Sequence, residues 1–112
     1  MDQTLFALSI LPGKTEAARA FLRELEGARK EQFAAVEQRL GLVKEVWAIQ
    51  ETGHGDLFIV YAAGRDIDDA MQQFEASQGE FEQWFIQRLR DTTGRQEDLK
   101  TKILADFQAS RP

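Results

Sequence analysis

Residues 57–63, with the sequence LFIVYAA, form a run in which the tyrosine hydroxyl is the one polar side-chain group. Side chains in a β-strand alternate between the two faces of the sheet, so a strand over 56–63 presents apolar groups on both faces. Residues 4–11, TLFALSIL, have the same character and end at a turn signal, Pro12-Gly13. A sheet built from such strands needs cover on both of its faces.

The spacing of apolar residues predicts the elements between these strands. From 15 to about 40 they recur at helical intervals, which predicts a long helix with a bend or a change of buried face at Gly27. Residues 42–51, LVKEVWAIQE, predict a further strand. The glycine-containing segment 52–55 is typical of a β-hairpin connection into the strand over 56–63.

The second helical region begins after the third strand. Asp66 is placed to cap its first turn, because a carboxylate there accepts hydrogen bonds from free backbone N–H groups. Ser77 and Glu80 have the spacing of a capping box, which predicts a break near Gly79 and a second helical segment. Gly94 is expected to end that segment.

The C-terminal segment 99–109, LKTKILADFQA, allows two interpretations. As a strand it places Thr101, Ile103, Ala105 and Phe107 on one face, and its composition would also suit a short helix. The strand is favoured because it completes the order β-α-β-β-α-β. That order is the ferredoxin-like arrangement, an α+β fold with an antiparallel sheet.

The totals limit the kinds of function. The chain has 112 residues, expected to form one domain over 1–112, and its 14 Lys and Arg against 19 Asp and Glu give a net charge of −5. The basic residues are scattered, so neither nucleic acid nor a membrane is expected as a partner. The absence of cysteine removes disulfides and thiolate chemistry. The N-terminal residues lack the features of a signal peptide, which predicts a cytoplasmic protein.

The ferredoxin-like arrangement places both helical regions on one face of the sheet and leaves the other face bare. Burying four or five medium-sized apolar side chains of that bare face would contribute roughly 1.5 to 3 kcal/mol each. We therefore expect a homodimer that packs its sheets face to face about a two-fold axis. Such a pair forms an α/β barrel whose interior is either filled by side chains or open to a ligand.

Several segments also resemble a known superfamily. They are LPGK (11–14), GDLFIVYAAG (55–64) and above all EFEQWFIQRLRDTTG (80–94). With these the chain resembles the dimeric α/β-barrel superfamily, and within it a family of small uncharacterised bacterial proteins. The superfamily includes cofactor-independent monooxygenases and haem-degrading enzymes. The resemblance implies a dimeric barrel of ferredoxin-like protomers, and it supplies no catalytic set that matches residues of this chain.

Three residues are candidates for contact with a ligand. Trp47 and Tyr61 could stack on a planar aromatic molecule if both face the barrel interior, although aromatic residues also fill cores and interfaces. His54 is the only histidine and could act as a base or a ligand. Its neighbours Gly53 and Gly55 favour the alternative, an exposed residue at a hairpin tip.

The sequence contains no motif for a nucleotide, a metal or another cofactor, and none is expected. Charged residues on the long helix, including Glu37, are interpreted as a solvated face with ion pairs within the helix. The first hypothesis is a homodimer that binds a small apolar or aromatic molecule or has a structural role. The alternative is a cofactor-independent monooxygenase-like enzyme acting on a small aromatic compound. A third hypothesis is haem binding through His54.

Overall fold

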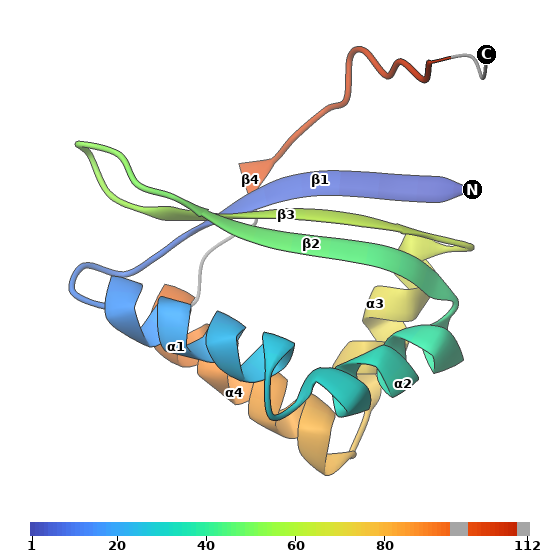
Figure 1. The fold of residues 1–112 in the computed structure, drawn as a ribbon, viewed down its shortest axis with the longest axis horizontal. Helices are drawn as coiled ribbons and strands as arrows, with labels where there is room; N and C mark the ends of the chain where they lie inside the picture. Colours follow the sequence, from blue (N-terminus) through green and yellow to red (C-terminus); the bar gives the residue numbers. More distant parts are fainter. Residues whose placement is uncertain (95–98, 110–112) are drawn as a thin grey trace.

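Strands and helices follow one another in the order β-α-α-β-β-α-α-β in the computed structural model, which describes residues 1–94 and 99–109 (Figure 1). The elements are β1 (Asp2–Ser9), α1 (Thr15–Glu26), α2 (Lys30–Leu40), β2 (Leu42–Gln50), β3 (Leu57–Gly64), α3 (Ile67–Ala76), α4 (Glu80–Thr93) and β4 (Leu99–Lys100). None of the helices in these described ranges is long and apolar enough to cross a membrane.

The four strands form one antiparallel sheet in the order β2-β3-β1-β4. The central strand β3 pairs along its whole length with β1, from Leu57 opposite Ser9 to Gly64 opposite Asp2. On its other side β3 pairs with β2, with an irregularity between Leu42 and Lys44. This order of strands confirms the ferredoxin-like α+β fold expected from the sequence.

In the part of the chain that the structure describes, helices α1 to α4 all lie on one side of the sheet (Figure 1). The long helix expected over 15–40 is divided, because α1 ends at Glu26 and α2 begins at Lys30. Arg29 stabilises this break: its guanidinium lies 4.2 Å from the ring centre of Trp84 and donates two hydrogen bonds to Glu80. The predicted change of direction at Gly27 is confirmed, and a cation–π contact and an ion pair connect it to α4.

The second helical region also divides where the sequence indicated. Asp66 caps α3 by accepting a hydrogen bond from the backbone N–H of Asp69 at 3.1 Å. The predicted capping box is wrong, because Gly79 is the residue that precedes α4 and the hydroxyl of Ser77 donates to Glu82 instead. Ser77 thus connects the end of α3 to the first turn of α4.

The core lies between the sheet and the helices and is largely aromatic. Phe58 and Val60 of β3 are fully buried, and Phe21 of α1 and Phe85 of α4 pack over them. The ring centres of Phe21 and Phe85 are 5.1 Å apart in an edge-to-face contact, and those of Phe21 and Phe58 are 6.4 Å apart. Edge-to-face pairs of this kind add stability beyond the area they bury.

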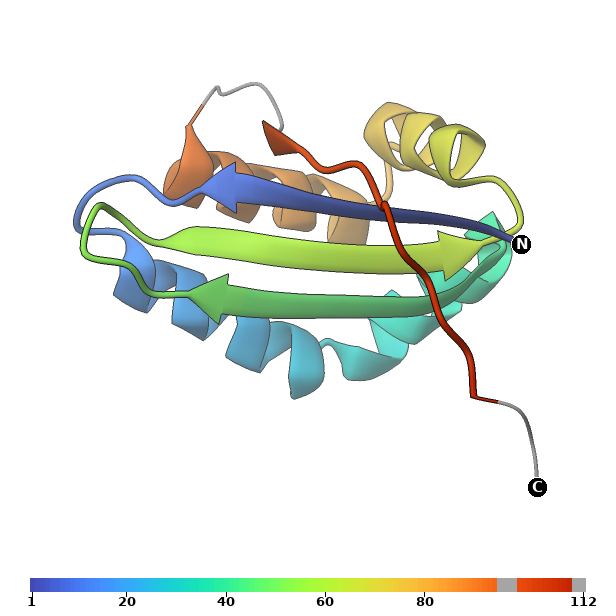
Figure 2. The same ribbon diagram turned by 90° about the horizontal axis from the view of Figure 1, so that it is seen from above.

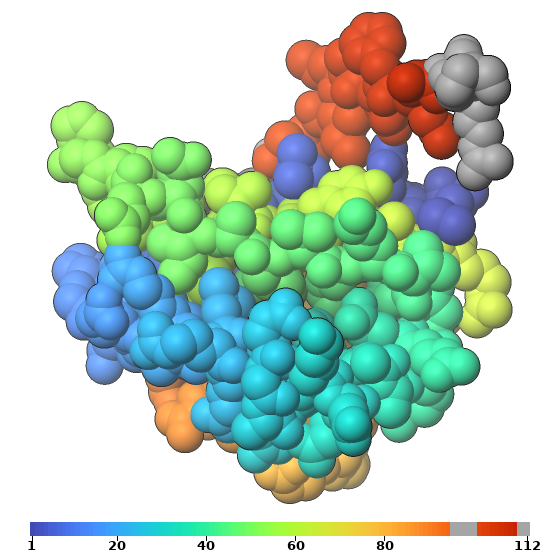
Figure 3. Space-filling view, in the orientation of Figure 1, coloured from blue at the N-terminus to red at the C-terminus, as the bar shows by residue number. Residues whose placement is uncertain are grey.

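The C-terminal strand is much shorter than predicted. Only Leu99 and Lys100 pair with β1, and residues 101–109 have no regular structure. After Lys100 the segment leaves the edge of β1 and passes over the face of the sheet opposite the helices (Figures 1 and 2). No strand forms there because a strand needs a partner for its backbone hydrogen bonds. Leu104 and Phe107 are 85% and 93% exposed there, and the segment stands clear of the body in Figure 3.

Candidate functional site

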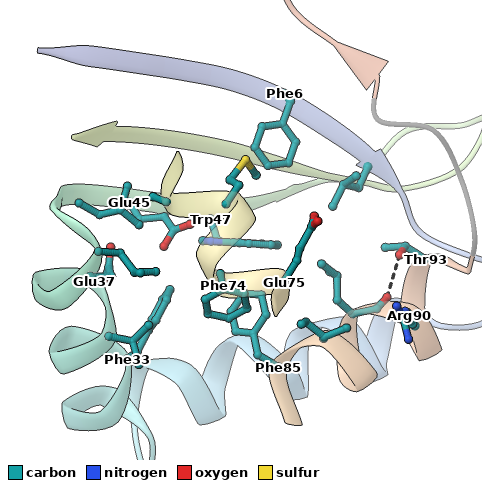
Figure 4. Close-up of a pocket in the computed structure, with 18 of the residues that line it drawn as sticks. Phe6, Phe33, Glu37, Glu45, Trp47, Phe74, Glu75, Phe85, Arg90 and Thr93 are labelled. Atoms are coloured by element: carbon teal, nitrogen blue, oxygen red, sulfur yellow. Dashed lines mark hydrogen bonds between the residues drawn. The ribbon is translucent and has the colours of Figure 1, made fainter. Parts of the chain in front are cut away.

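A pocket of about 880 Å³ opens between the sheet and the helices (Figure 4). Its walls come from strands β1 and β2 and from helices α2, α3 and α4. Five aromatic side chains make its interior largely apolar: Phe6, Phe33, Trp47, Phe74 and Phe85. The sequence analysis expected a cavity on the bare sheet face, whereas this pocket lies on the opposite, helical side.

The alternation of β2 determines what this strand contributes. Glu45, Trp47 and Ile49 are partly buried and face the helices, while Val46 and Ala48 between them are exposed on the other face. The ring of Trp47 is anchored by edge-to-face contacts at 5.3 Å to Phe58 and 5.7 Å to Phe85. Trp47 therefore forms a rigid wall between the pocket and the core.

Two carboxyl groups face each other at one end of the pocket. Glu37 projects from α2 and Glu45 from β2, and the two side chains are joined by a hydrogen bond. Burial, and to a lesser extent the charge of Glu37, raise the pKa of Glu45 to about 8, while the Trp47 N–H acts in the opposite direction. Burial also raises the pKa of Glu37. Because the pKa of Glu45 lies above 7, its carboxyl group is mostly protonated at neutral pH.

The indole nitrogen of Trp47 completes this polar end of the pocket. Its Nε1 atom is buried and meets no acceptor at hydrogen-bonding geometry. The ring and the Glu45 carboxyl group point toward one another (Figure 4). The N–H is close enough to favour the ionised form of Glu45 but leaves one buried donor unsatisfied, which costs free energy unless a bound group accepts from it.

The opposite side of the pocket is more open and carries charge of both signs. Glu75 on α3 and Arg90 on α4 line it, and both residues are exposed. Met71, also on α3 and in the lining of the pocket, is 41% exposed. Solvent therefore reaches part of the wall formed by α3 and α4.

The structure does not bring the three predicted contact residues together. Trp47 lines the pocket, but Tyr61 lies on the bare face of the sheet, where its hydroxyl donates a 2.8 Å hydrogen bond to Gln3. His54 is exposed in the connection between β2 and β3, and its backbone N–H donates to the hydroxyl of Thr52. Because His54 does not line the pocket, it would not ligate a haem bound there.

Sequence reasoning missed both carboxyl groups of this site. Glu37 was assigned to a solvated helix face, yet it lies four residues after Phe33 and three before Leu40, both of which line the pocket. Glu45 shares a strand face with Trp47, two residues away. An acidic residue in step with the apolar residues of an element is the signal that would have identified each of them.

Over residues 1–94 and 99–109, no three histidine or acidic side chains gather closely enough to hold a metal ion. The chemistry of the site therefore rests on a carboxyl pair, an indole N–H and aromatic surfaces. Such a site can bind a planar molecule and exchange a proton with it.

Two solved structures have a similar fold over nearly the whole chain. Tetracenomycin F2 cyclase from Streptomyces glaucescens, a type-II polyketide cyclase, has a TM-score of 0.59 at 16% identity and covers 98% of this chain and 100% of its own. A dimeric ferredoxin-like protein from an uncultured marine organism has a TM-score of 0.60 at 14% identity, with 96% and 97% covered. No family model and no curated protein matches the sequence. The likeness confirms the ferredoxin-like α+β fold.

Proposed function

We propose that this protein binds a small, planar, mainly apolar molecule in the pocket between the sheet and the helices. The observation that carries the proposal is the pocket itself, about 880 Å³ in volume and walled by aromatic side chains. Ligand pockets typically measure about 300 to 1,000 Å³ and combine an apolar lining with a few polar groups.

The protein is proposed to act as a homodimer that pairs the bare faces of two sheets. Side chains on this face come from all three long strands and are largely apolar: Leu5, Ala7, Val46, Ala48, Ile59 and Tyr61. Val46 is 44% exposed, and the exposed Leu104 and Phe107 of the C-terminal segment extend over the same side of the sheet. The solved ferredoxin-like neighbour is itself described as dimeric.

Fluorene, a planar hydrocarbon, tests the pocket. We expect saturable binding to the wild-type protein by equilibrium dialysis and at least about 10-fold weaker binding to Trp47→Ala, because aromatic stacking contributes about 1 to 3 kcal/mol. Phe74→Ala, which removes an aromatic side chain from the wall formed by α3, should also weaken binding. Tyr61→Phe, on the other face of the sheet, is the control and should bind as the wild type does. Circular dichroism verifies that each variant is folded, and equal binding by all four proteins would refute the proposal.

A second candidate function is a cofactor-independent oxygenase acting on an aromatic compound in the same pocket. It is favoured by the Glu37–Glu45 pair, because a carboxylate held in an apolar site can take a proton from a phenol and leave an electron-rich ring. Oxygen uptake with anthrone should exceed the rate without protein and fall at least about 10-fold in Glu45→Leu. A wild-type rate equal to the background would leave binding as the function.

A further inference from the structure

The polar end of the pocket contains more hydrogen-bonding capacity than its own residues use. Glu37 and Glu45 together offer four oxygen atoms at this end of the pocket. Within residues 1–94 and 99–109, neither group forms an ion pair with lysine or arginine. Beside them the Trp47 N–H is buried and lacks an acceptor at hydrogen-bonding geometry. The end of the pocket thus has spare acceptors next to one spare donor.

A hydroxyl group matches this arrangement because it donates one hydrogen bond and accepts another through the same oxygen. A carbonyl could accept from Trp47 but could donate nothing to the carboxyl pair. An amine would bring a second donor or a positive charge and could not accept from the indole when protonated. A hydroxyl between the Trp47 Nε1 atom and the Glu45 carboxyl group would use both.

We propose that the pocket selects aromatic compounds that carry a hydroxyl group, with the hydroxyl accepting from the Trp47 N–H and donating to the Glu37–Glu45 pair. This inference rests on the proposed binding function and names the class of ligand, a planar phenol. The aromatic walls hold the ring system. The polar end orients it, so that the edge with the hydroxyl group faces Glu37 and Glu45. Trp47 has both roles, because its ring face is part of the wall and its N–H is part of the polar end.

The matched ligands fluorene and 2-hydroxyfluorene test the inference, since they differ by one hydroxyl group. We expect the wild-type protein to bind 2-hydroxyfluorene about 10-fold more tightly than fluorene at pH 7. The ratio should fall to about 1 in Glu45→Leu, which replaces the acceptor by an apolar side chain of similar size. Glu45→Gln retains a carbonyl oxygen, and its ratio should lie closer to that of the wild type.

Glu31→Leu is the matched control, because Glu31 is exposed on α2 outside the pocket and its loss should leave the ratio unchanged. A wild-type ratio near 1, or an undiminished ratio in Glu45→Leu, would overturn the hydroxyl preference while fluorene binding still supports the pocket. Absence of binding by either compound would instead overturn the proposed function. The two failures are therefore distinct.

Discussion

Replacing Ile59 by aspartate is expected to dissociate the proposed homodimer. Ile59 lies in the middle of β3 on the bare face, between Ala7 and Ala48 of the neighbouring strands. Two-fold symmetry would bring two aspartates into one dry interface, where unpaired or opposed charges cost several kcal/mol. We expect the dissociation constant of the dimer to rise at least about 1,000-fold, which corresponds to about 4 kcal/mol. Sedimentation velocity between 1 and 50 μM, roughly the range in which such a shift is visible, measures this change.

The control places the same aspartate on the helical side of the protein. Met71 is 41% exposed on α3, away from the bare face, so Met71→Asp should leave the sedimentation coefficient unchanged. Ile59→Asp changes a side chain outside the core between sheet and helices, so we expect the dissociated chain to remain folded. Circular dichroism distinguishes this outcome from unfolding. A wild-type chain that sediments as a single subunit throughout this range would contradict the homodimer itself.

The free energy of unfolding is expected to fall as the pH rises from 5 to 9. Burial and the neighbouring charge of Glu37 raise the pKa of Glu45 to about 8, above the ordinary value of 4.5 that it regains in the unfolded chain. Between these two values the folded state binds more protons than the unfolded state, so stability decreases with pH. A loss of about 3 kcal/mol, nearly complete at pH 9, follows from the size of this shift after allowance for relaxation.

Glu45→Gln should abolish most of this slope, since the amide does not titrate, and should exceed the wild type in stability at pH 9. The other charged groups that line the pocket, Glu75 and Arg90, remain in both proteins. The buried Glu82 does not contribute to this slope. Burial opposes its ionisation, but hydrogen bonds from Ser77 and Arg39 lower its pKa. Its titration therefore affects stability in more acidic solution. Urea unfolding at fixed protein concentration gives the free energy of unfolding of both proteins as a function of pH. The same pH dependence in the two proteins would contradict the raised pKa of Glu45.

Most of the fold could be predicted because its determinants are local. The apolar run 57–63 predicted a strand, and Gly27 and Gly79 marked where helices divide, since these signals depend on nearby residues. The C-terminal segment was different. Its alternating pattern suits a strand, but whether a strand forms depends on a partner, and beyond Lys100 the segment leaves the edge of β1. Alternation of residues carries no information about that partner.

The candidate site was less predictable because it joins elements that are distant in sequence. Trp47 was identified from its chemistry, but Tyr61 was grouped with it although the pairing places the two on opposite faces of the sheet. The pair of Glu37 and Glu45 depends on how α2 lies on β2, which residue spacing within each element does not define. Charge alone suggested solvent exposure for Glu37, whereas its position among Phe33 and Leu40 determined burial.

The break after Gly27 has a consequence for the carboxyl pair. A continuous helix over 15–40 would be roughly 39 Å long and would approach the 46 Å length of the whole molecule. Because the chain turns instead, α2 lies against β2 and α3 and carries Glu37 to its partner. Arg29 holds this turn in place, because it contacts Trp84 and donates hydrogen bonds to Glu80. The acid pair therefore depends on a turn outside the pocket as well as on its two glutamates.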